Sequence, residues 1–288
     1  MEKLRTALLD FKLGEVAEQI LQFAKKSIRA STTLTADEAI QIGQSKIGGS
    51  PDVPTDFVWP LTNNNNQPLY FLCQLNLTEV KSYDSNNLLP ADGLLSFFYD
   101  VIGQPWGYDP NDGDGFHVFH FTQAPDSLKR MQQPAVLTEY IDSAALHFRN
   151  EWTLPSWASP YSKNLETILT KEQQDAYNDF FYDWVDEEAQ EQTTHRIDGH
   201  PDTIQGDMYL QCQLVTNGLY CGDSTAYNHP LRRELEPHVK DWHLLLQLDS
   251  EDDLGYMWGD SGKLYFWIRE EDCKNKDFDK VWTVLQCY

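Results

Sequence analysis

The sequence predicts an α+β fold, mainly antiparallel β, made of two internally duplicated β-rich half-units with an N-terminal helix and an inserted helix. The 288 residues are 41% hydrophobic and 13% aromatic, which is typical of a chain that folds around a large core. Short apolar and aromatic runs bounded by turn residues recur along the chain, as expected for strands. Several sequence elements also recur in the same order in both halves.

The first helix is predicted within residues 1–30. Gly14 is expected to mark a break in this helix or a close contact. Across 3–28, apolar residues recur at the spacing of one helix face, namely Leu4, Leu8, Phe11, Val16, Ile20, Phe23 and Ile28.

The inserted helix is predicted over 170–192. It begins with a capping box, in which Thr170 and Gln173 can exchange hydrogen bonds with each other's backbone. We expect its apolar face to cover the sheet, and that face carries Ala176, Tyr177, Phe180, Phe181 and Trp184.

Strands are predicted from runs rich in aromatic and aliphatic residues that lie between Gly, Pro, Asn and Asp. These runs are 69–77, 94–102, 116–121, 207–214, 243–248, 263–268 and 281–287.

An internal repeat relates the two halves. The shared order is a basic residue followed by Ile-x-Gly-x-Pro-Asp, then Leu-x-Gln-Leu, then Asp-Gly or Asp-Ser-Gly before an aromatic strand, then a last strand. We therefore predict one domain, 1–288, with half-units 42–160 and 195–288 that share a core. The matching segments are Lys46–Asp52 with Arg196–Asp202, Leu72–Leu77 with Leu245–Asp249, Leu89–Phe98 with Trp258–Trp267, and Phe116–Phe121 with Val281–Cys287.

The charge is strongly acidic, with 22 basic and 45 acidic residues and a net charge of −23. Such a surface repels nucleic acid and anionic membranes, and it is compatible with a basic protein partner. Solubility alone is the simpler interpretation.

The cysteines are odd in number, five in all, and form no CxxC pair. The N-terminus lacks the apolar segment of a signal peptide, and no stretch approaches a membrane span. These features predict a cytoplasmic protein whose thiols fill the core.

The run Gly259-Asp-Ser-Gly262 resembles the loop around a protease nucleophile. A catalytic serine needs a histidine base and an oxyanion hole, and no histidine lies in the sequence context of such enzymes. The matching segment of the first half, Ala91-Asp-Gly93, has no serine. We therefore predict a turn that leads into a strand, and no catalytic residue.

Metal and cofactor motifs are incomplete, so neither a metal nor a cofactor is predicted. Asp109–Gly115 resembles a calcium loop but lacks its first and last ligands, and Ser250–Asp253 is an acidic turn. Whether either of these two segments binds a cation stays open. No zinc spacing and no glycine-rich phosphate loop occurs.

Two glutamines stand in the middle of apolar strands, Gln74 and Gln247. A buried amide is costly unless its donors and acceptors are met, so each is expected to bind the backbone of its own Gly-x-Pro-Asp segment. The alternative is a ligand cleft between the halves, with the candidate residues Gln74, Gln247, Asp249, Trp258 and Asp260.

A family resemblance covers nearly all of the chain except part of 124–170. The chain resembles the YwqG-like family of uncharacterised bacterial proteins, a domain of unknown function. This resemblance implies a duplicated α+β fold in an intracellular bacterial protein, and it supplies no catalytic residues. The residues that carry it include Ser45–Asp52 with Trp59-Pro60, Gln74, Pro90–Leu94, Gln247–Asp253, Met257–Gly262, Phe266, Glu271-Asp272 and Lys276–Phe278.

Two functions follow from these features. The first is a non-catalytic binding or interaction protein, whose acidic surface suits a basic protein partner, as in an inhibitor or immunity protein. The alternative is a hydrolase-type enzyme that uses carboxylates such as Asp249, Asp253 or Asp260 in the cleft between the halves.

Overall fold

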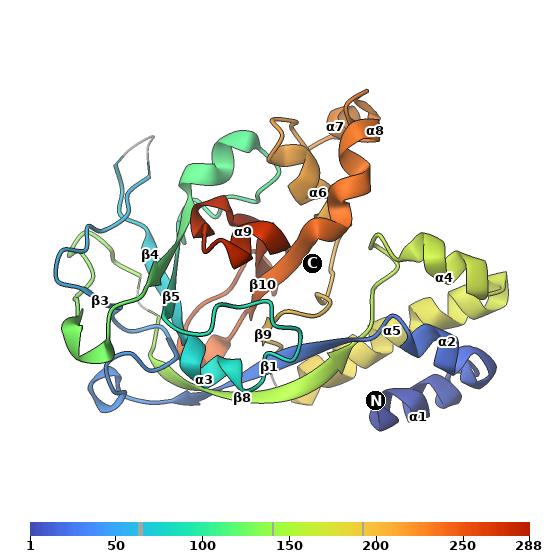
Figure 1. The fold of residues 1–288 in the computed structure, drawn as a ribbon, viewed down its shortest axis with the longest axis horizontal. Helices are drawn as coiled ribbons and strands as arrows, with labels where there is room; N and C mark the ends of the chain where they lie inside the picture. Colours follow the sequence, from blue (N-terminus) through green and yellow to red (C-terminus); the bar gives the residue numbers. More distant parts are fainter. Residues whose placement is uncertain (63–65, 140, 192) are drawn as a thin grey trace.

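The computed structural model describes residues 1–62, 66–139, 141–191 and 193–288. Its main feature is an antiparallel sheet whose ten strands run in the order β12-β11-β10-β9-β1-β8-β2-β4-β5-β6, so the predicted α+β class is confirmed (Figure 1). Their bounds are β1 Lys25–Leu34, β2 Lys46–Ile47, β4 Tyr70–Asn76, β5 Leu94–Tyr99, β6 Phe116–Phe121, β8 Ala144–Thr153, β9 Arg196–Ile197, β10 Trp242–Asp249, β11 Lys263–Arg269 and β12 Trp282–Gln286. The strands β3 Asp52–Pro54 and β7 Leu128–Arg130 form a separate pair.

The centre of the sheet is the antiparallel pair β1 and β8, which run side by side along one edge of the molecule in Figure 1. All ten residues of each strand are paired, from Lys25 with Thr153 to Leu34 with Ala144. The sequence did not predict either strand, because their mixed polar and apolar residues lack the uniform apolar character of the other strands.

Outward from this pair, the strand order is matched on the two sides. On one side, β8 pairs with β2 and then come β4, β5 and β6, and on the other β1 pairs with β9 and then come β10, β11 and β12. In the first half, β2, which leads into the Gly-x-Pro-Asp segment, pairs with β8, and in the second half β9 pairs with β1. The pair β1 and β8 therefore joins the two sides of the sheet.

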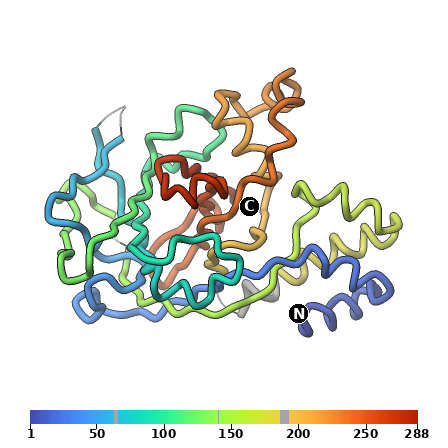
Figure 2. The backbone as a smooth tube through the Cα atoms, viewed as in Figure 1, coloured from blue at the N-terminus to red at the C-terminus, as the bar shows by residue number. Residues whose placement is uncertain are grey.

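The sheet coils around a shared core. Phe97 of β5 and Phe266 of β11 meet at 5.0 Å between ring centroids, although many strands separate them in the sheet. The tube in Figure 2 shows the C-terminal strands, in red, next to the green strands of the first half. The core cluster contains buried residues from both 42–160 and 195–288.

The N-terminal helix is shorter than predicted. It consists of α1 Glu2–Asp10, a 3-10 helix Gly14–Val16 that begins at the predicted break, and α2 Ala17–Leu21. The prediction of helix up to residue 28 is wrong, because Lys25–Ile28 belong to β1. Here pairing with β8 outweighs the helical spacing of Phe23 and Ile28.

The inserted helix is α5 Lys171–Glu191, and its capping box is confirmed, since Thr170 N donates to Gln173 Oε1 at 3.0 Å and Gln173 N to Thr170 Oγ1 at 3.3 Å. The predicted last residue, 192, lies outside the described residues. Its apolar face packs mainly against α1, α2 and α4 Ser162–Ile168, for example through Phe180 against Phe11 at 5.6 Å. It forms a helical layer with these helices at the ends of β1 and β8, which corrects the expectation of a helix that covers the sheet.

The predicted strand 207–214 is wrong, because this segment is helix α6 Met208–Val215. Asp207 caps it by accepting from Tyr209 N at 2.9 Å and Leu210 N at 3.2 Å. A short apolar run is compatible with either a strand or a helix, and the N-terminal cap that Asp207 provides favours the helix here. The remaining helices are α3 Leu77–Lys81, α7 Ser224–Asn228, α8 Arg232–Leu235 and α9 Glu270–Lys274. In the part of the chain that the structure describes, no helix has both the length and the apolar character needed to span a membrane.

Candidate functional site

The first predicted site residue, Gln247, is completely buried and all of its amide is used. Its Oε1 accepts from Asp202 N at 2.9 Å, and its Nε2 donates to Asp202 Oδ2 at 2.9 Å and to Thr194 O at 2.7 Å. Gln247 therefore ties the Gly-x-Pro-Asp segment to β10.

Gln74 makes the same contacts in the first half. Its Oε1 accepts from Asp52 N at 2.9 Å, and its Nε2 donates to Asp52 Oδ2 at 2.7 Å and to Gln44 O at 2.7 Å. Gln44 and Thr194 each lie two residues before the basic residue of the repeat. Both glutamines thus bind the backbone of their own Gly-x-Pro-Asp segment, which was the simpler of the two interpretations of the sequence.

The basic residues of the repeat are buried beside these amides. Lys46 Nζ donates to Ser50 O at 2.6 Å and pairs with Asp37 at 2.5 Å. Arg196 Nη1 donates to His200 O at 3.1 Å and pairs with Asp202. Each basic side chain donates to the backbone carbonyl of the residue four positions later in the chain. Lys46 and Arg196 therefore occupy matching positions in the two halves.

The electrostatics of these clusters are dominated by burial. Burial lowers the pKa of Lys46, although Asp37 and Asp52 oppose this change. For Asp202, burial favours the neutral acid, but the charges of Arg196 and Lys263 outweigh it and lower the pKa to about 2. These charges are therefore structural and are neutralised within the protein.

The structure does not bring the five predicted residues into one cleft. Gln74 and Gln247 alternate along their strands with residues of the shared core, so they lie on the opposite face of the sheet. Trp258 is buried in that core, where its ring lies 5.7 Å from that of Tyr99. Asp260 is exposed on a turn, and Asp249 is described below.

The run Gly259–Gly262 is a turn, as predicted. Ser261 has a left-handed φ of 48°, and Gly262 N donates to Trp258 O at 2.8 Å. Gly262 O accepts from Ser250 N at 3.2 Å, just as Gly93 O accepts from Leu77 N at 2.9 Å in the first half. Among the described residues, no hydrogen bond joins Ser261 to a histidine, so the geometry of a catalytic serine is missing here.

The two acidic segments left open as cation sites turn their carboxylates toward the protein's own backbone or toward solvent. Asp109 and Asp112 cap the 3-10 helix Pro110–Asp114 by accepting backbone N–H groups. Asp252 and Asp253 are exposed. Within the described ranges, no group of three or more His, Cys, Asp and Glu side chains is placed to hold a metal ion.

An acidic groove of about 650 Å³ lies beside the Gly259–Gly262 turn. Asp249 at its base pairs with Lys263 Nζ at 2.9 Å and accepts from Thr194 N at 2.8 Å. Glu251 accepts from Thr32 Oγ1 at 2.5 Å and meets His195 Nε2 at 2.8 Å. The groove is lined by Ser31, Thr32, Thr193, Asp249, Ser250, Glu251, Asp252, Asp253, Met257, Ser261, Lys263 and Tyr288.

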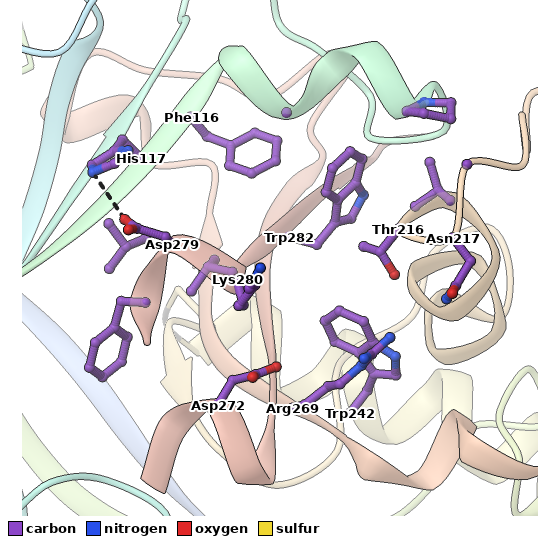
Figure 3. Close-up of a pocket in the computed structure, with 17 residues that line it drawn as sticks. Phe116, His117, Thr216, Asn217, Trp242, Arg269, Asp272, Asp279, Lys280 and Trp282 are labelled. Atoms are coloured by element: carbon purple, nitrogen blue, oxygen red, sulfur yellow. Dashed lines mark ion pairs between the residues drawn. The ribbon is translucent and has the colours of Figure 1, made fainter. Parts of the chain in front are cut away.

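A second hollow, the seam pocket, has a volume of about 500 Å³ and lies where β6 of the first half meets the last strands of the second (Figure 3). Its buried aromatic residues are Phe116, Trp242, Phe278 and Trp282, and Arg269 and Asp272 line it as well. None of these residues was predicted from the sequence as a site residue. For Arg269, Asp272 and Trp282 the available signal is the cluster of charged residues around one tryptophan within 269–282, directly after a predicted strand.

Comparison with curated proteins finds no match. A family model for a domain of unknown function, DUF1963, matches residues 45–287, which include nearly all of both half-units, the whole lining of the seam pocket and most of the lining of the acidic groove. The chain therefore belongs to the DUF1963 family.

Proposed function

We propose that the protein is a non-catalytic binding protein whose acidic groove receives a basic partner, as an inhibitor or immunity protein would. The observation that carries this proposal is the composition of the groove. The exposed carboxylates of Asp252 and Asp253 stand beside two exposed apolar side chains, Met257 at 44% and Tyr288 at 73% exposure.

Charge supports a basic partner. The net charge is −23, and several of the few cations are used inside the protein: Lys263, Lys46 and Arg196 are all buried in ion pairs with carboxylates. They contribute little positive potential at the surface. A lysine-rich or arginine-rich partner would thus be attracted at long range, and more strongly at low salt.

Rigidity of the groove also supports binding. The wall at 257–261 is held from a distant loop, because Gln104 Oε1 accepts from Gly259 N at 3.0 Å and Gln104 Nε2 donates to Met257 O at 3.4 Å. Ser250 Oγ accepts from Trp258 N at 2.9 Å. A preformed surface loses less conformational entropy on binding than a loose one.

A carboxylate-using hydrolase is supported less well. Burial raises the pKa of Asp249, but the charge of Lys263 and its hydrogen bond outweigh this and leave the pKa below its usual value. A general acid needs the opposite change. Asp253 and Asp260 are exposed to solvent and lack the apolar surroundings that a general acid needs.

We also infer that the two half-units arose by duplication. The matched contacts of Gln74 and Gln247 support this, as does the matched strand order on both sides of β1 and β8. The YwqG-like resemblance and the five unpaired, buried cysteines support a bacterial, cytoplasmic protein.

The test is a titration of the full chain with an amphipathic peptide of lysines and leucines, followed by fluorescence anisotropy at low and high salt. The double variant Asp252→Lys with Asp253→Lys is expected to weaken binding about tenfold or more, since each rim charge contributes up to about 1 kcal/mol.

The matched control is Asp56→Lys with Asp126→Lys, which changes the net charge equally at exposed sites outside the groove. It is expected to weaken binding much less. Equal weakening by both double variants would mean that only the total charge matters, and the groove proposal would fail.

A further inference from the structure

The seam pocket is a second candidate site, separate from the acidic groove, and the two share no lining residue. Its volume of about 500 Å³ falls in the range of small-molecule sites. Residues from both half-units form it, with Phe116 at the start of β6 on one side and Trp242 and Trp282 at the starts of β10 and β12 on the other.

The aromatic walls of the pocket are fixed by their own contacts. The rings of Phe116 and Trp282 meet edge to face at 5.3 Å. The indole of Trp282 donates to Gly107 O at 2.9 Å, and that of Trp242 donates to Gln213 Oε1 at 2.8 Å. Because both indole N–H groups are satisfied, these side chains offer a ligand apolar surface and little else.

Arg269 is the most firmly positioned cation in the pocket. Its guanidinium lies over the ring of Trp242 at 5.0 Å, and its Nη2 donates to Gln213 Oε1 at 3.3 Å. A stacked guanidinium keeps its remaining N–H groups in one plane, a geometry that matches a carboxylate.

Asp272 and Lys280 are further charged residues that line the pocket (Figure 3). Burial raises the pKa of Asp272, while the charges of Arg269 and Lys280 act in the opposite direction. Figure 3 draws one ion pair in the pocket, between His117 and Asp279 at 3.7 Å. Over the described parts of the chain, Arg269, Lys280 and Asp272 form no ion pair of their own.

We propose that the seam pocket binds a free α-amino acid with an apolar or aromatic side chain. The carboxylate of the ligand is placed at Arg269 and Lys280, its ammonium group at Asp272, and its side chain against the aromatic wall that Phe116 and Trp282 form together. Arg269, Lys280 and Asp272 then each gain an ion pair with the ligand.

The charge of the whole protein favours such a ligand over a simple anion. With a net charge of −23, the protein repels anions, whereas a zwitterion carries no net charge and is not repelled. The aromatic walls disfavour a ligand whose side chain is itself charged, because burial of that charge would be uncompensated. Glutamate is therefore expected to bind more weakly than phenylalanine or leucine.

The experiment is isothermal titration of the full chain with phenylalanine, leucine, glutamate, N-acetylphenylalanine and phenylalaninamide. The last two lack the ammonium and the carboxylate, respectively. Phenylalanine and leucine are expected to bind, and each derivative at least about tenfold more weakly, because each loses a charge-assisted contact. No heat from phenylalanine or leucine, or equal affinity for the derivatives, would overturn the proposal.

Two variants test which residue of the pocket binds which charged group of the ligand. Asp272→Asn is expected to weaken phenylalanine binding about tenfold and to leave N-acetylphenylalanine unchanged. Arg269→Gln is expected to weaken phenylalanine and to leave phenylalaninamide unchanged. Circular dichroism melts establish that both variants fold. The controls are Asp126→Asn and Arg233→Gln, which lie outside the pocket, and equal weakening by these controls would contradict the assignment.

Discussion

Gln247 holds Asp202 by two hydrogen bonds, from Asp202 N to its Oε1 and from its Nε2 to Asp202 Oδ2, each at 2.9 Å. Both residues are buried, and Gln74 with Asp52 repeats the arrangement in the other half-unit. The glutamines are therefore structural, since they fasten a loop segment to the outer face of the sheet in each half.

The first prediction concerns this pair. Gln247→Leu leaves Asp202 N and Thr194 O without their partner, and each buried, unsatisfied group costs about 1–3 kcal/mol. We expect the free energy of unfolding to fall by about 2–5 kcal/mol, measured by urea denaturation. Gln74→Leu should have a similar effect, because its contacts are equivalent.

The control is Gln19→Leu, an exposed glutamine of α2, for which a change within about 0.5 kcal/mol is expected. If Gln247→Leu is no more destabilising than this control, the structural role of the glutamine is refuted.

The second prediction concerns acid stability. The pKa of Asp202 is about 2 in the folded state, below its ordinary value of 3.8, so its stabilising contribution is complete above pH 5. This contribution is lost as the pH falls through about 4 to 2, and amounts to about 2 kcal/mol. We expect Asp202→Asn to flatten the acid limb of the unfolding free energy against pH, while Asp126→Asn leaves it unchanged.

The third prediction has the opposite sign. Burial raises the pKa of Asp207, the cap of α6, to about 6, against the hydrogen bonds that it accepts from Leu210 and Tyr209. Its contribution to stability is present below about pH 4 and is lost as the pH rises to 6. Asn keeps the cap without the charge, so Asp207→Asn should stabilise the protein by about 1–2 kcal/mol at pH 7.

Thermal melts across pH 3–8 check this prediction. The gain from Asp207→Asn should vanish below about pH 4, where the native carboxyl group is protonated in both states. A variant that is less stable than the native protein at pH 7 would show that the charged cap is favourable after all.

The fourth prediction concerns Ser261, whose φ of 48° is in the left-handed region. This conformation costs an ordinary residue about 1–2 kcal/mol, and glycine costs about 0.5–1 kcal/mol in chain entropy. Ser261→Gly should therefore raise the free energy of unfolding by about 0.5 kcal/mol, whereas Ser261→Ala should not. A serine-reactive fluorophosphonate should leave Ser261 unlabelled, and labelling there would indicate an activated nucleophile.

The sequence predicted those parts of the fold whose local pattern agrees with the final structure. The run 116–121 is β6 with the same bounds, and 263–268 is β11 within one residue, since turn residues flank each uniform apolar run. The central strands β1 and β8 were missed because their register depends on pairing with each other across more than a hundred residues. Long-range pairing leaves no local period in the sequence.

The site was harder to predict than the fold. Gln74 and Gln247 were found because a polar residue in an apolar strand is conspicuous, and their partners followed from the repeat. The contact between Arg269 and Trp242 could not be predicted from the sequence. Their stacking depends on how β10 and β11 pair and on where α9 begins. The acidic groove was anticipated only through Asp249 and the turn Ser250–Asp253.

The acidic groove as the site for a basic partner is tested most directly by hydrogen–deuterium exchange of the full chain, with and without the lysine–leucine peptide. We predict slower exchange of backbone amides within 250–261, which form the turn and wall of the groove, and unchanged exchange within 269–282, which lines the seam pocket. Peptide binding that leaves the exchange of 250–261 unchanged would contradict the proposal.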